Sequence, residues 1–143
     1  MRPNPWRMLR DHADVTLRIA PLPEGLLGVT LHRQHLITLN RTMDATERRC
    51  VLAHELAHWE RGPVPCIPVL AAKEEAACDV IAAQHLIPID ALADLTWCDN
   101  LGQAAEELDV TEDVLACRLD HLTDSERDLL AALSDTPFVG VSL

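Results

Sequence analysis

The sequence predicts an α+β fold, with a small sheet followed by a series of helices. Short strand-like stretches lie within the first 40 residues. Two longer helical stretches follow, one bounded by Asp44 and Gly62 and one ended by Pro88. Shorter helical stretches continue beyond Pro88. Strands that precede helices, instead of alternating with them, are typical of the α+β class.

The N-terminal part is expected to form one helix and three strands. Residues 6–11 read as a short helix, and residues 15–19 alternate between apolar and polar side chains as a strand does. Strands at 26–32 and 35–39 are separated only by Arg33-Gln34, which predicts a hairpin whose turn lacks the favoured Gly or Asn. We therefore expect a small three-stranded antiparallel sheet packed on the next helix.

That helix has clear start and stop signals. Asp44 followed by Glu47 matches a capping box, so the helix should begin near Ala45. No Gly or Pro interrupts it before Gly62, where a C-terminal stop is expected, and Pro63 prevents continuation. The sequence predicts about four helical turns.

The run His54-Glu55-Leu56-Ala57-His58 is an HExxH motif in the last half of this helix. Histidines four residues apart share a helix face and can bind one metal ion, and the intervening glutamate can take a proton from a water molecule at the metal. The pattern predicts zinc-assisted hydrolysis of an amide bond, with Glu55 as its catalytic acid/base. The alternative is a pair of surface histidines on an amphipathic helix. The opposite face of the helix is apolar, with Leu52, Leu56 and Trp59.

A third metal ligand is expected on the following helix. Residues 73–83 read as an Ala-rich helix with Glu75 and Asp79 one turn apart, and three prolines between 62 and 68 predict an extended connection. Glu75 would complete a His2Glu site with His54 and His58. Asp79 would accept the free ring N–H of a ligating histidine. The alternative for both acids, and for Glu74, is a solvated helix face.

These segments resemble the ImmA/IrrE metallopeptidases, a gluzincin-like family. One matching segment is 47–58, where an Arg-rich stretch precedes HExxH. The other is a helix that contains Glu75 near its start and continues into Ala-Ala-Gln-His-Leu-Ile-Pro at 82–88. The resemblance extends over about residues 15 to 120. It implies a zincin-like fold, Zn²⁺ bound by His54, His58 and Glu75, and Glu55 as the acid/base. The chain departs from the common pattern at Cys78 and Ile81, and neither position is expected to touch the chemistry.

Composition and length fit one small domain spanning residues 1–143. The five cysteines form no C-x-x-C pair and read as free thiols, although Cys50 and Cys66 flank the metal helix and leave a thiolate site as an alternative. No stretch resembles a signal peptide or a membrane span, so we expect a cytoplasmic protein without membrane contact. The chain has no Tyr, so a histidine, an arginine or a backbone N–H must stabilise any tetrahedral oxyanion.

Helices are expected at about 89–97, 101–108, 112–120 and 124–133, the last capped by Thr123 and Glu126, with a loosely held tail at 135–143. Residues 103–119 resemble a helix-turn-helix. Residues 51–143, however, hold 4 basic and 18 acidic residues of a chain whose net charge is −11. So acidic a surface repels phosphate, and we interpret these helices as bracing the domain and not as binding nucleic acid.

The sequence as a whole predicts a zinc-dependent endopeptidase. The family resemblance implies that the substrate is a separate helix-turn-helix transcriptional repressor of a mobile element, prophage or stress regulon. The alternative is a non-catalytic protein with structural zinc that sequesters a repressor or another regulator. The presence of Glu55 favours the enzyme, because a structural site has no need of a carboxylate there.

Overall fold

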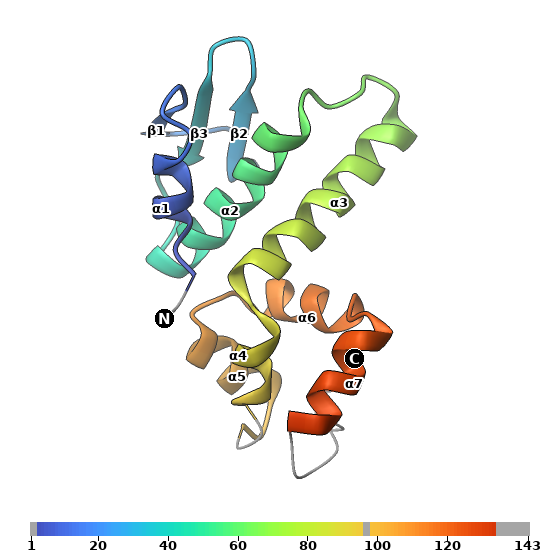
Figure 1. Ribbon diagram of the computed structural model, residues 1–143. Helices are drawn as coiled ribbons and strands as arrows, with labels where there is room; N and C mark the ends of the chain where they lie inside the picture. Colours follow the sequence, from blue (N-terminus) through green and yellow to red (C-terminus); the bar gives the residue numbers. More distant parts are fainter. Residues whose placement is uncertain (1–2, 96–97, 134–143) are drawn as a thin grey trace.

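The computed structural model describes residues 3–95 and 98–133. It contains α1 Pro5–Arg10, β1 Thr16–Ala20, β2 Gly28–Leu31, β3 Leu36–Asn40, α2 Ala45–Arg61, α3 Pro68–Leu86, α4 Ile89–Ala93, α5 Leu101–Leu108, α6 Glu112–Asp120 and α7 Asp124–Leu133. The sheet and α1 lie along α2, α3 runs back beside α2, and α4 to α7 gather at the far end of α3 (Figure 1). The predicted α+β class is confirmed.

The sheet is mixed, so the prediction of an antiparallel sheet is wrong for one of its two strand pairs. β2 and β3 are antiparallel, with Leu31 opposite Leu36, as the predicted hairpin requires. β1 is parallel to β3 and lies on its other side, which gives the strand order β1-β3-β2. The prediction assumed that strands adjacent in sequence pair with each other.

The loop between β1 and β2 explains the mixed sheet. Its residues, 21–27, are enough to span two strand spacings of about 4.8 Å each. Asn40, at the end of β3, forms hydrogen bonds with the last two residues of this loop. The Asn40 backbone N–H donates to the carbonyl of Leu27 at 2.7 Å, and its side-chain amide donates to the carbonyl of Leu26 at 2.9 Å. β2 therefore lies at an edge of the sheet, where it also contacts α2.

The β2–β3 turn is longer than the predicted Arg33-Gln34. It comprises residues 32–35, and His35 adopts a left-handed φ of 52° where Gly or Asn is usual. The rings of His32 and His35 lie against Trp59 of α2, with centroid distances of 5.5 and 5.3 Å. These contacts stabilise a turn that its own residues disfavour, and they tie the hairpin to α2.

α2 has the predicted bounds and caps. The Asp44 side chain accepts from the backbone N–H of Glu47 at 2.8 Å, and the Glu47 side chain accepts from the Asp44 N–H at 3.3 Å. Gly62 ends the helix with a φ of 97°. Leu52 and Leu56 are fully buried in a cluster with Ile37 and Leu39 of β3. The apolar face of α2 therefore packs on the sheet.

α3 begins earlier than the predicted residue 73. Pro68 stands in its first turn, where a proline costs no hydrogen bond and its fixed φ suits a helix. Only two of the three prolines thus belong to the extended connection. The added turn lets α3 reach back along much of α2, and the two helices pack side by side (Figure 1).

The C-terminal helices form a second core. α5, α6 and α7 have the predicted bounds, whereas α4 ends at Ala93, before the predicted residue 97. Buried residues of α5 and α6, among them Ala105 and Leu115, join Ala53 of α2 and Ala82 of α3 in one cluster. The helix-turn-helix segment is thus packed into the domain. The predicted tail at 135–143 lies outside the described residues. Within the described ranges, no helix is long and apolar enough to cross a membrane.

Arg118 joins the end of α3 to α6 and α7. Its side chain is 3% exposed and pairs with Glu126. Its Nε donates to the carbonyl of Ile87 at 2.8 Å. Glu126 also completes the predicted capping box with Thr123. Arg118 therefore anchors the C-terminal end of α3 to α6 and α7.

We expect Glu126→Gln to lower the free energy of unfolding at pH 7 by roughly 1–2 kcal/mol, discounted because Glu126 is partly exposed. The hydrogen bond from Arg118 holds the pKa of Glu126 below its ordinary value of 4.5. Its contribution is therefore present above pH 4.5 and is lost as the pH falls through the lower folded-state pKa. Urea unfolding across this pH range measures the effect, and a difference between the two proteins that is independent of pH would contradict it.

Candidate metal centre and cleft

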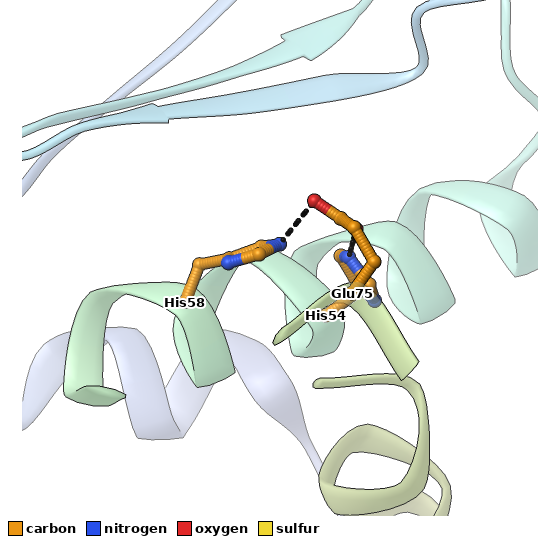
Figure 2. A group of neighbouring side chains, drawn as sticks. All are labelled: His54, His58 and Glu75. Atoms are coloured by element: carbon orange, nitrogen blue, oxygen red, sulfur yellow. Dashed lines mark hydrogen bonds and ion pairs between the residues drawn. The ribbon is translucent and has the colours of Figure 1, made fainter. Parts of the chain in front are cut away.

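Three metal-ligand side chains converge between α2 and α3. His54, His58 and Glu75 each offer one ligand atom, and these atoms lie within 4.8 Å of one another. His54 Nε2 lies 2.9 Å from Glu75 Oε2, and His58 Nε2 lies 3.0 Å from Glu75 Oε1 (Figure 2). Both rings direct Nε2 toward the same carboxylate. Two imidazoles and one carboxylate form one of the donor sets that bind zinc at catalytic sites.

The helices bring these residues together in two steps. The four-residue spacing of His54 and His58 places both rings on the face of α2 toward α3. Arg61, at the end of α2, pairs with both carboxylate oxygens of Glu74, at 2.7 and 2.8 Å. Glu74 therefore bonds to the end of α2, and Glu75, the next residue, contacts the histidines.

Each histidine also has a partner for its second ring nitrogen. His54 Nδ1 lies 2.9 Å from an oxygen of Asp79, the residue expected to accept a ring N–H from a ligating histidine. His58 Nδ1 lies 3.4 Å from the Cys78 sulfur. Cys78, one of the two positions that depart from the family pattern, therefore contacts a candidate metal ligand. Its spacing could have indicated the contact, because residues three and four positions after Glu75 share its helix face.

Glu55 points from α2 toward β2, whereas His54 and His58 point toward α3. Its side chain is 6% exposed, and its Oε1 accepts a hydrogen bond from the Thr30 hydroxyl at 2.9 Å. Gly28 allows this approach, since a Cβ there would meet Glu55 Cγ at 3.0 Å and Val51 Cγ1 at 2.8 Å. Sequence reasoning missed both Gly28 and Thr30. A glycine inside a strand pattern is the signal that could have found them.

The charges around the cluster favour a cation there. Burial opposes a charged His54, but its hydrogen bond to Asp79 and the nearby carboxylates of Glu55 and Glu75 outweigh this and raise the pKa of His54 to about 9. Burial raises the pKa of Glu55, against the influence of His54 and the Thr30 hydrogen bond. Without an ion, a proton on His54 supplies positive charge among the carboxylates. A bound metal ion would supply the positive charge in place of that proton.

A cleft of about 650 Å³ opens beside the cluster. His54, Glu55, His58 and Glu75 line it, together with apolar side chains that include Leu26, Leu27, Val51 and Val64. Its wall carries further carboxylates from Glu47, Asp79 and Asp113. No Lys or Arg of the described residues lines it. The cleft is thus apolar and acidic, and the possible metal ligands are accessible from it.

The thiolate alternative gains no support from the described residues. Cys50 is buried and lines the cleft, Cys66 is exposed, and neither belongs to the group of side chains that could hold a metal ion. Burial raises the pKa of the Cys50 thiol, which disfavours the thiolate that a zinc ligand needs.

Most of the chain matches a known protein family. The family model for the IrrE N-terminal-like domain of the M78 peptidases matches residues 10–120. No curated protein and no solved structure gave a match. The matched range covers most of the chain and includes the three strands, α2 and α3. The chain therefore belongs to the ImmA/IrrE-type family of metallopeptidases.

Proposed function

We propose that this protein is a zinc-dependent endopeptidase of zincin-like fold that cleaves a helix-turn-helix transcriptional repressor. The observation that carries the proposal is the convergence of His54, His58 and Glu75 beside a buried Glu55, all open to one cleft. The family membership supports peptide hydrolysis. The repressor substrate rests on the family resemblance of the sequence.

The donor set fits zinc. The two Nε2 atoms and the Glu75 carboxylate would be the three protein ligands, and the cleft leaves room for a water molecule and a substrate carbonyl. When bound, zinc lowers the pKa of water and polarises a carbonyl group. Asp79 would orient the His54 ring through Nδ1, so that Nε2 faces the ion.

Glu55 would be the catalytic acid/base. Its carboxylate follows the first histidine on α2 and lines the cleft, while the Thr30 hydroxyl holds one of its oxygens. The other oxygen is then available to take a proton from the attacking water and to return it to the leaving amine. Burial raises the pKa of Glu55 above its ordinary value, which makes its carboxylate a stronger base.

β2 would bind the peptide substrate. It lies at the edge of the sheet, so its outer side has no partner strand within the described residues. Leu27 bonds to Asn40 of β3, and in an antiparallel pair every second residue bonds outward. The backbone groups of Gly28 and Thr30 therefore face outward, next to Glu55. An extended peptide could pair with them, and a backbone N–H from this edge could bind the oxyanion.

The chemistry of the cleft suits a substrate with apolar and basic residues. Its apolar lining would accept Leu or Val side chains, whereas the carboxylates of Glu47, Asp79 and Asp113 would attract Lys or Arg. The DNA-binding part of a repressor is basic, and the described residues of the C-terminal helices are strongly acidic. Charge attraction would thus bring such a repressor to this protein.

Zinc stoichiometry tests the metal site. We expect about one zinc per monomer, and its loss in a His54→Ala, His58→Ala double variant. Glu75→Ala should weaken binding strongly, because it removes a ligand, and Asp79→Ala about 10-fold to 100-fold, because it leaves the His54 ring less well oriented. Glu74→Ala is the control, because it removes an exposed pair with Arg61 but no metal ligand, and it should change zinc affinity little. Full zinc occupancy in the double histidine variant would place the site elsewhere.

Glu55→Gln separates an enzyme from a sequestering protein. The substitution keeps the size of the side chain but removes the base, so zinc and repressor binding should persist while cleavage falls by about 10²-fold to 10⁴-fold or more. The repressor encoded beside the gene is the first substrate to test, with cleavage followed by gel electrophoresis and derepression by a reporter gene. If the variant relieves repression as well as the wild type does, sequestration replaces catalysis as the mechanism.

A further inference from the structure

The thiol of Cys78 contacts His58, one of the three proposed metal ligands, but takes no part in the proposed water activation. Its sulfur lies 3.4 Å from Nδ1 of His58, whose Nε2 lies 3.0 Å from Glu75. We propose that Cys78 is a positioning residue for metal binding, which accepts a hydrogen bond from His58 Nδ1–H and thereby leaves Nε2 to face the ion. This inference rests on the metal site of the proposed function.

The geometry gives Cys78 control over the orientation of His58. Glu75, Cys78 and Asp79 occupy positions i, i+3 and i+4 of α3 and share one helix face. α3 therefore contacts both nitrogens of the His58 ring, one through Glu75 and one through Cys78. A neutral imidazole carries one proton. With that proton on Nδ1 and shared with sulfur, the lone pair of Nε2 is free to bind a metal ion held between His58 and Glu75.

Burial makes the thiol the partner on which His58 depends. His58 is 4% exposed and Cys78 is 0% exposed, so bulk water does not reach the contact. A buried N–H without a partner costs about 1–3 kcal/mol. His54 differs, because its partner Asp79 has a side chain that is 60% exposed. Loss of the Asp79 carboxylate admits water to His54, whereas loss of the Cys78 thiol leaves His58 Nδ1 unpaired.

A thiol also suits the charge at this position. Glu55 is buried nearby, and Glu75 already contacts His58. A carboxylate at position 78 would add a further buried negative charge, which is costly without a paired cation. Sulfur is a neutral and weak acceptor. It fixes the protonated nitrogen of His58 without competing for the ion as a charged ligand.

Three variants separate hydrogen bonding from packing. Cys78→Ser keeps a polar acceptor but is smaller, Cys78→Val keeps bulk but has no acceptor, and Cys78→Ala has neither. Zinc affinity is measured by competition with a chromophoric chelator, after urea unfolding has shown that each variant is folded. We expect affinity within about threefold of the wild type for the Ser variant, and a loss of about 10-fold to 100-fold for the Ala and Val variants.

Cys50 provides the matched control, since it is also a buried cysteine, and Cys50→Val and Cys50→Ser should bind zinc normally. Imidazole nitrogen NMR of the zinc-loaded protein should show the His58 proton on Nδ1 in the wild type and the Ser variant. The proposal is overturned if affinity follows side-chain volume, with Val above Ser, or if all Cys78 variants bind equally. It is also overturned if the cobalt-loaded wild type shows thiolate-to-metal absorption that Cys78→Ser abolishes, because sulfur is then a ligand.

These outcomes separate this inference from the proposed function. A wild type that binds no zinc would overturn both. Normal zinc affinity in every Cys78 variant would overturn the positioning role alone. Normal zinc binding without peptide cleavage would overturn the proposed peptidase and leave the role of Cys78 intact.

Discussion

The side-by-side packing of α2 and α3 is the constraint on which the grouping of His54, His58 and Glu75 depends. Helical periodicity alone places His54 and His58 together, but Glu75 reaches them only because α3 returns along α2. Small side chains permit the close approach, since Ala53 of α2 and Ala82 of α3 are buried in one cluster. A larger residue at either position would separate the helices, and the donor atoms with them.

β2 imposes a second constraint from the other side of α2. Gly28 lets the strand approach Glu55 closely, and Thr30 bonds to that glutamate. Consecutive residues of one helix thus face different elements, with His54 held from α3 and Glu55 held from the sheet. α2 fixes the distance between Glu55 and the two histidines, and α3 and β2 fix the orientation of their side chains. Such support is needed for a site that must be rigid.

Local signals in the sequence predicted much of this structure, because they need no knowledge of distant contacts. The capping box at Asp44 and Glu47 set the start of α2, and the HExxH spacing identified the paired histidines. The parallel β1–β3 pair could not be predicted in this way. It depends on the β1–β2 loop, which is held by Asn40 at the end of β3. The spacing of Cys78 from Glu75 indicated a shared helix face. The identity of its partner, His58 on α2, depends on how the two helices pack.

The charges around the two histidines link metal binding to the stability of the folded state. Glu55, Glu75 and Asp79 surround the histidines, and their mutual repulsion opposes the compact state unless a cation lies among them. A proton on His54 supplies one positive charge, whereas a divalent ion supplies two and binds donor atoms that are already within 4.8 Å of one another. Because the unfolded chain has no such arrangement, ion binding favours the folded state. The acidity of the cleft would then serve both parts of the proposed function, because it favours a bound cation and attracts a basic substrate.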